Sequence, residues 1–167
     1  SGEGMAAIFK DISVDQVIEG GQTMNPSASD IANAICKINA ENIFVFPNNK
    51  NIILAAEQSK QLIEGKTIHV IPTKNVPQGI AAALAFNPEE SAEVNKIEML
   101  HATDNVVAGQ ITYAVRNTKV DDFSLKKGDI IGLDDKKILA KAASIKECAV
   151  ELIKALKEKS HSVINLY

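Results

Sequence analysis

The side chains best suited to chemistry in this sequence are uncharged hydrogen-bonding groups, concentrated in three polar segments at residues 20–27, 47–51 and 72–79. The candidate binding residues there are Gln22, Thr23, Asn25, Asn48, Asn49, Asn51, Thr73, Lys74 and Gln78. Each segment leads into a predicted helix, whose free N–H groups and dipole favour an anion. The segments are suited to a phosphate, a carboxylate or a partner's backbone. Because Asn, Pro and Gly are also the ordinary residues of turns, a purely structural role stays open.

Arg116 is a further candidate, because it is the single arginine beside 17 lysines. Its planar guanidinium offers a five-donor fork that lysine cannot copy. We therefore predict that Arg116 makes a bidentate contact with a carboxylate of this chain or with a partner. The alternative is an ordinary surface residue at the end of a strand.

Other constellations carry little chemistry. The three histidines, at 69, 101 and 161, lack metal-ligand spacing. The sequence contains no Cys-x-x-Cys, no Gly-x-Ser-x-Gly and no Gly-x-x-x-x-Gly-Lys-Ser/Thr. We assign no catalytic residue, no metal site and no cofactor to the chain. We expect it to be a binding domain rather than an enzyme.

The elements that position these residues follow from hydrophobic patterning. Apolar runs predict strands at 16–19, 43–46 and 66–71, and helical periodicity follows each polar segment. Alternation of strand, loop and helix predicts a three-layer α/β core over residues 2–105, with a mainly parallel sheet and helices on both faces. The carboxyl ends of parallel strands share one edge of a sheet, so the three polar segments should meet there.

The pattern changes after the first two-thirds of the chain. Residues 107–141 are predicted to be rich in β-hairpins, with a long strand at 109–117 and paired strands at 130–133 and 138–140. An amphipathic helix is expected over 142–159 and the start of a strand over 161–166. We predict a single α/β domain over 1–167 that contains this β-rich subregion.

Composition narrows the function classes. The chain has 167 residues, 46% hydrophobic and 23% charged, which excludes disorder. Its net charge of −3 gives no sign of a nucleic-acid partner. The longest apolar run, 80–86, is too short to span a bilayer, and no secretion signal is evident, so we expect a cytoplasmic protein without a transmembrane segment. The start at Ser1 and the strand expected at the end suggest a fragment of a longer multidomain protein.

Several long strings resemble one family. They are Glu19-Gly-Gly-Gln-Thr-Met-Asn-Pro-Ser27, Pro47-Asn-Asn-Lys-Asn-Ile52, Ile71-Pro-Thr-Lys74, Pro77-Gln-Gly79, Ala85-Phe-Asn-Pro88, Gly109-Gln-Ile-Thr-Tyr-Ala-Val-Arg116 and Lys127-Gly-Asp-Ile-Ile-Gly132. Over essentially its whole length the chain resembles the carboxy-terminal domain of the ATP-binding subunit of bacterial fatty acid kinases, also described as dihydroxyacetone-kinase-like or YloV-type proteins and related to the DegV-type α/β group.

The resemblance implies a parent kinase whose amino-terminal domain holds ATP and Mg²⁺. Such kinases phosphorylate a fatty acid held by a separate DegV-type carrier, giving an acyl phosphate for phospholipid synthesis. The carboxy-terminal region is implicated in engaging that carrier. From the resemblance we expect a further strand before Gly2 and a final unit after Tyr167 in the parent protein, and we carry no catalytic residue onto this chain.

These observations suggest a partner-docking or regulatory domain of a fatty acid kinase, with the DegV-type carrier and the other kinase domains as its partners. One alternative is a small-molecule or anion-binding domain of a dihydroxyacetone-kinase-like protein. Another is an enzyme in its own right, such as a sugar or triose kinase. The lack of a phosphate-binding glycine motif argues against that last reading.

Overall fold

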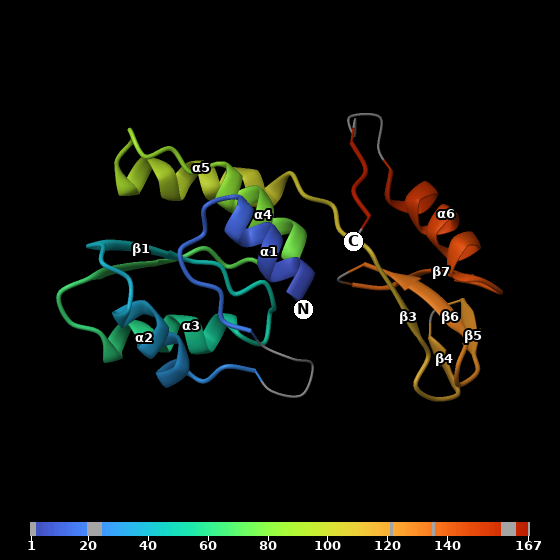
Figure 1. The fold of residues 1–167 in the computed structure, drawn as a ribbon. Helices are drawn as coiled ribbons and strands as arrows, with labels where there is room; N and C mark the ends of the chain where they lie inside the picture. Colours follow the sequence, from blue (N-terminus) through green and yellow to red (C-terminus); the bar gives the residue numbers. More distant parts are fainter. Residues whose placement is uncertain (1–2, 20–24, 121, 135, 158–162, 167) are drawn as a thin grey trace. The chain divides into compact units, whose positions relative to one another are not determined.

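The computed structural model describes residues 3–19, 25–120, 122–134, 136–157 and 163–166. Its internal contacts divide the chain into two units, Ser1–Val106 and Val107–Tyr167 (Figure 1). The sequence predicts one domain over 1–167, with a β-rich subregion from 107 to 141. The boundary between the two units falls where that subregion begins.

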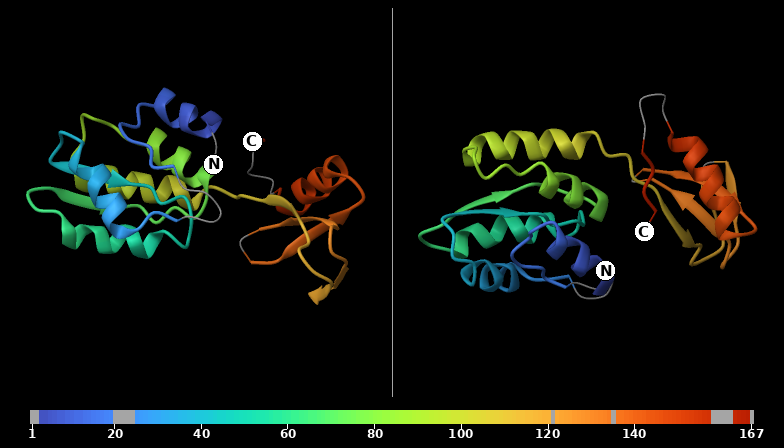
Figure 2. Two further views of the ribbon diagram at one scale, coloured as in Figure 1. Left: turned by 60° about the horizontal axis from the view of Figure 1, so that its bottom comes forward. Right: turned by 45° about the horizontal axis from the view of Figure 1, so that its top comes forward.

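The first unit places helices on both faces of a two-stranded parallel sheet (Figure 2). Its elements are α1 (Glu3–Asp11), α2 (Ala28–Cys36), β1 (Asn42–Val45), α3 (Ile53–Ser59), the 3-10 turn η1 (Lys60–Leu62), β2 (Thr67–Val70), α4 (Val76–Leu84) and α5 (Ala92–Asp104). Ile43 lies opposite Ile68 and Val45 opposite Val70 in the parallel register. The predicted parallel pairing of these two apolar runs is confirmed.

Two apolar cores lie on the two faces of this sheet. The core beneath α2 and α3 contains Ile31, Ile35, Ile43, Ala56 and Val70. The core beneath α4 and α5 contains Ile71, Ala82 and Met99, with Phe44 and Phe46 packed against it. Successive side chains of a strand point to opposite faces, so Ile43 and Phe44 serve different cores.

Helix α2 begins where the sequence predicts it. Ser27 accepts a hydrogen bond from the Asp30 backbone N–H, and the Asp30 carboxylate accepts one from the Ser27 backbone N–H at 2.9 Å. The bond from the Ser27 hydroxyl to Asp30 is the main cause that lowers the pKa of that carboxyl. This reciprocal cap satisfies N–H groups that the first helical turn leaves unpaired.

The second unit packs one helix on a small antiparallel sheet. Its elements are β3 (Gln110–Tyr113), β4 (Thr118–Val120), β5 (Phe123–Leu125), β6 (Ile130–Leu133), β7 (Ile138–Ala142) and α6 (Ile145–Leu156). The main sheet has the order β3-β6-β7, and β4 pairs with β5. Cys148 and Leu152 of α6 pack on Ala140. A second cluster contains Ala114, Leu125 and Ile131. The neighbouring residue of β6, Ile130, packs against the first cluster, so the two faces of the sheet have separate cores.

The predicted fold class is confirmed only in its coarse form, as a mixture of helices and sheet. The three-layer, mainly parallel sheet is not found for the chain as a whole: the parallel sheet of the first unit has helices on both faces but only two strands, and the other two sheets of described strands are antiparallel. No strand forms at Gln16–Glu19. The long strand predicted over 109–117 ends at Tyr113, because Ala114 pairs with the turn at Gly128 and Asp129 instead.

The other predicted elements lie close to their observed places. The hairpin of 130–133 with 138–140 is confirmed by the pairing of β6 with β7. Residues 163–166 form no strand, and residues 161 and 162 lie outside the described part of the chain. None of the described helices has the length and apolar character needed to cross a membrane.

Candidate functional site

The loop that follows β1 and the loop that follows β2 touch through a pair of side chains. The hydroxyl of Thr73 donates to Asn48 Oδ1 at 2.9 Å, and it accepts a bond from the Asn48 backbone N–H, also at 2.9 Å. Thr73 has no exposed surface. The expectation that segments 47–51 and 72–79 meet at one edge of the parallel sheet is therefore confirmed for these two loops.

Asn48 has a special backbone conformation at this contact. Its φ of 56° lies in the left-handed region, which asparagine tolerates better than most residues. The first turn of α4 lies against its side chain, because a Cβ added at Gly79 would come within 2.0 Å of Asn48 Oδ1. Asn48 is thus held between the buried hydroxyl of Thr73 and Gly79, and its side-chain oxygen already accepts a hydrogen bond from Thr73.

The amino terminus of α4 is capped by residues of the same loop. Asn75 accepts a bond from the Gln78 backbone N–H at 3.0 Å. Gln78 Oε1 accepts one from the Lys74 backbone N–H at 2.7 Å. Its amide nitrogen lies 3.4 Å from the Thr103 carbonyl oxygen, at the weak end of hydrogen bonding. The Gln78 side chain thus ties α4 to the preceding loop and to α5.

Asn49 forms a local turn before α3. Its side-chain oxygen accepts a bond from the Asn51 backbone N–H at 2.9 Å, and its carbonyl accepts one from Ile52. This Asx turn is a common way for asparagine to direct the chain into a helix. The geometry gives Asn49 a structural task, and a binding role for it stays a prediction.

The remaining predicted residues are distributed more widely. Gln22 and Thr23 lie outside the described residues, and Asn25, Asn51 and Lys74 are exposed. Arg116 lies in the second unit and is also exposed. It forms no ion pair with any carboxylate of the described residues, so its bidentate contact stays a prediction for a partner.

The outward groups of the first unit's loop edge are Lys50, Asn51 and Lys74. Every buried side-chain polar atom in the described part of the chain has a hydrogen-bond partner. Among those residues, no group of three or more His, Cys, Asp or Glu side chains could hold a metal ion. The edge is therefore an ordered surface whose buried polar groups are already hydrogen-bonded within the chain.

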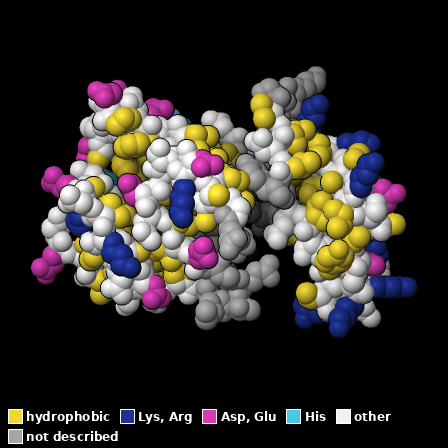
Figure 3. All heavy atoms as spheres, in the orientation of Figure 1, with side chains coloured by type: hydrophobic (Ala, Val, Ile, Leu, Met, Phe, Trp, Pro, Cys, Tyr) yellow, Lys and Arg dark blue, Asp and Glu magenta, His cyan; other side chains and the backbone are white. Residues whose placement is uncertain are grey.

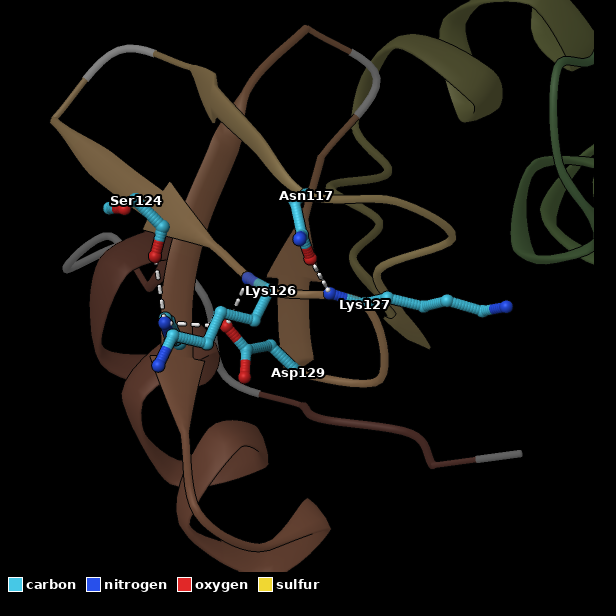
Figure 4. Close-up of polar contacts among 6 residues, drawn as sticks. Asn117, Ser124, Lys126, Lys127 and Asp129 are labelled. Carbon is cyan, nitrogen blue, oxygen red and sulfur yellow. Dashed lines mark hydrogen bonds and ion pairs between the residues drawn. The ribbon is translucent and has the colours of Figure 1, made fainter.

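A polar cluster in the second unit was not singled out from the sequence (Figure 4). The Asp129 carboxylate accepts bonds from the Lys126 backbone N–H at 2.7 Å and from Lys141 Nζ at 2.6 Å. Asn117 Oδ1 accepts a bond from the Lys127 backbone N–H at 2.8 Å. The Lys126 bond, followed by the Lys141 bond, lowers the pKa of Asp129. The one sequence signal was the turn composition of Lys-Lys-Gly-Asp.

The whole chain, residues 1–167, matches the family of C-terminal domains of FakA-like fatty acid kinase subunits, and it belongs to that family. It is 50% identical over 132 residues to Protein YloV of Bacillus subtilis, covering 79% of this chain and 24% of YloV. It is also 40% identical over 165 residues to an uncharacterized protein of Staphylococcus saprophyticus, covering 99% of this chain and 30% of that protein.

A third relative, an uncharacterized protein of Staphylococcus aureus strain USA300, is 36% identical over 165 residues, covering 99% of this chain and 30% of that protein. The chain thus spans between about a quarter and a third of the length of the curated relatives it matches. The predicted membership of the YloV-type family is confirmed.

Proposed function

We propose that this chain is the partner-docking and regulatory domain of a fatty acid kinase. The observation that carries the proposal is the family match over all 167 residues, to a family named for fatty acid kinases. In this proposal ATP and Mg²⁺ bind another domain of a cytoplasmic parent protein. The present domain positions a DegV-type carrier so that the carboxylate of its fatty acid meets the γ-phosphate, giving an acyl phosphate for phospholipid synthesis.

The proposed docking surface is the loop edge of the first unit. Its backbone is ordered by the Asn48–Thr73 bonds and by the cap of α4, so little conformational entropy is lost when a partner binds. Its outward groups are two lysines and an amide, which favour specific hydrogen bonds with a partner. The bonds made by Asn48, Asn49 and Gln78 support this surface from within.

The test uses a full-length kinase that contains this domain. The triple variant Lys50→Ala, Asn51→Ala, Lys74→Ala removes the outward groups and leaves the buried bonds intact. The control variant Lys10→Ala, Asn33→Ala, Lys37→Ala removes the same residue types from exposed positions on α1, on α2 and at the C-cap of α2. We expect carrier affinity to fall at least about tenfold for the first variant only, the loss of roughly 1.4 kcal/mol of binding free energy. Unchanged affinity in a folded loop variant would refute this docking surface.

A further inference from the structure

The two units carry opposite net charge. Residues 1–106 contain 7 lysines and arginines against 13 acidic residues, a net of −6. Residues 107–167 contain 11 against 8, a net of +3. The excess of positive charge therefore belongs to the smaller unit, although the whole chain is acidic.

Part of that positive charge lies at one end of the second unit's sheet. Two turns meet there: residues 114–117, after β3, and residues 126–129, between β5 and β6. We call them together the basic turn pair; they contain the exposed cations Arg116, Lys126 and Lys127. In the space-filling view, Lys and Arg side chains lie at the lower end of this unit, and a second group lies beside α6 (Figures 1 and 3).

Hydrogen bonds hold the two turns against each other. The Ala114 N–H donates to the Asp129 carbonyl at 2.9 Å, and the Gly128 N–H donates to the Ala114 carbonyl at 2.8 Å. Gly128 has a φ of 93°, a conformation that favours glycine. Together with the bond from the Lys127 N–H to Asn117, these contacts fix where the cations emerge from the backbone.

The nearby acidic residue, Asp129, forms no ion pair with the side chains of these three cations. Asp129 uses its carboxylate on the Lys126 backbone and on Lys141, which also donates to the Ser124 carbonyl at 2.8 Å. Among the described residues, no carboxylate forms an ion pair with the side chain of Arg116, Lys126 or Lys127. The Lys127 side chain points away from the polar cluster in Figure 4. Asp122 lies at the far end of the β4–β5 hairpin, beyond the pair Val120–Phe123.

Apolar side chains stand beside the cations. Val115, within the first turn of the basic turn pair, is 83% exposed, and Tyr113, at the end of β3 just before that turn, is 56% exposed. Exposed valine and tyrosine next to lysine and arginine suit the boundary between lipid headgroups and acyl chains, where aromatic rings and basic side chains concentrate.

We propose that the basic turn pair, with Tyr113 and Val115, binds the surface of an anionic lipid bilayer. Because the two turns lie together at the end of a sheet, several of their cations can contact a flat layer of lipid phosphates at the same time. The guanidinium of Arg116 can in addition bind one phosphate group through two hydrogen bonds. A surface that binds a protein would be expected to contain a recess or a row of hydrogen-bonding groups. The basic turn pair instead presents charged side chains and the exposed apolar side chains of Tyr113 and Val115. The contact is peripheral and reversible, and it is independent of the proposed carrier docking.

The experiment is sedimentation of the 167-residue chain with vesicles of phosphatidylcholine alone, or with part of the lipid replaced by phosphatidylglycerol. We expect binding to the anionic vesicles only, weakening as salt is added, because an acidic chain binds them only through a local basic surface. Each cation near such a surface contributes about fivefold in partitioning, so Lys126→Glu, Lys127→Glu should lower binding at least about tenfold. Arg116→Lys keeps the charge and should cause a smaller loss.

The matched control is Lys136→Glu, Lys137→Glu, which makes the same charge change in the turn at the opposite end of β6. This control should bind like the unaltered chain. Equal losses in the two double variants, or no binding of the unaltered chain, would overturn the proposal. Binding to soluble polyglutamate as strong as to the anionic vesicles would also overturn it, in favour of an acidic protein surface. Circular dichroism of each variant verifies that the fold is retained.

Discussion

At the scale of single residues, Thr73 is the strongest test of the loop edge. Its fully buried hydroxyl serves both the backbone N–H and the side chain of Asn48. Thr73→Val keeps the shape but leaves two polar atoms of Asn48 without their partner. We expect the free energy of unfolding to fall by about 1–3 kcal/mol, the usual cost of leaving buried polar groups unpaired. Urea denaturation measures this loss.

Thr73→Ser is the matched variant, because it retains the hydroxyl and loses one methyl group. It should cost less than Thr73→Val, even though it removes apolar volume from a buried position. The reverse order would mean that packing rather than hydrogen bonding holds the two loops together.

Asp129 gives a prediction about pH. Hydrogen bonds from the Lys126 backbone and from Lys141 lower its pKa in the folded state, below the unfolded value of about 3.9. The ionised carboxylate therefore stabilises the fold at neutral pH, and this contribution is lost as the pH falls through the folded pKa. Asp129→Asn should reduce stability at pH 7, and its difference from the unaltered chain should shrink on acidification.

Urea denaturation at a series of pH values measures that difference. Asp122→Asn, which removes a carboxyl from the far end of the β4–β5 hairpin, serves as the control and should produce a smaller effect. A stability difference for Asp129→Asn that stays constant from neutral to acid pH would contradict the assigned role of the ionised carboxylate.

At the scale of elements, the first turn of α4 depends on the absence of a side chain at residue 79. A Cβ there would overlap Asn48 Oδ1, which is tied to Thr73. Gly79→Ala should destabilise the fold by about 1–3 kcal/mol, although alanine is normally the better helix residue. Gly4→Ala in α1, where no atom lies within 4 Å of the added Cβ, should be neutral or stabilising. Thermal unfolding of both variants gives the comparison, and equal behaviour would contradict the close packing.

The elements also show how far sequence reasoning carries. The parallel pair was predictable because Ile43–Phe46 is a continuous apolar run and Ile68–Ile71 is apolar except for His69, as expected of strands with apolar packing on both faces. Residues 16–19 contain only two adjacent apolar residues, which is too little to define a strand. The end of β3 depends on hydrogen bonds from Ala114 to a turn some 15 residues later, and these leave no local signal.

The same limit applies to the candidate site. Three polar loops at helix starts were visible in the sequence, and two of them do meet. The partner of Asn48 lies 25 residues away, so the sequence could not show that its side chain is already occupied. Gln78 is likewise engaged with the Lys74 backbone. The outward groups Lys50, Asn51 and Lys74 are therefore distinguished from the internally bonded ones only by the structure.

At the scale of the whole molecule, the second unit should fold by itself. It spans 61 residues, Val107–Tyr167, and has apolar clusters on both faces of its sheet. Domains of about this size can fold alone when they have their own core. The amide NMR spectrum of residues 107–167 should therefore superimpose on the corresponding signals of the full chain. A spectrum with the narrow dispersion of an unfolded chain would contradict this.

The last prediction concerns nucleotide binding by the chain as a whole. Phosphoryl transfer needs residues that clamp the γ-phosphate together with Mg²⁺, and the sequence contains no phosphate-binding glycine motif. Under the proposed function, that clamp belongs to another domain of the kinase. Titration of the chain with Mg-ATP in a calorimeter should give no binding heat at millimolar nucleotide, whereas titration with a DegV-type carrier protein should give a saturating isotherm. Saturating heat with Mg-ATP would overturn the assignment of the nucleotide to another domain, and no heat with any carrier would count against the docking role.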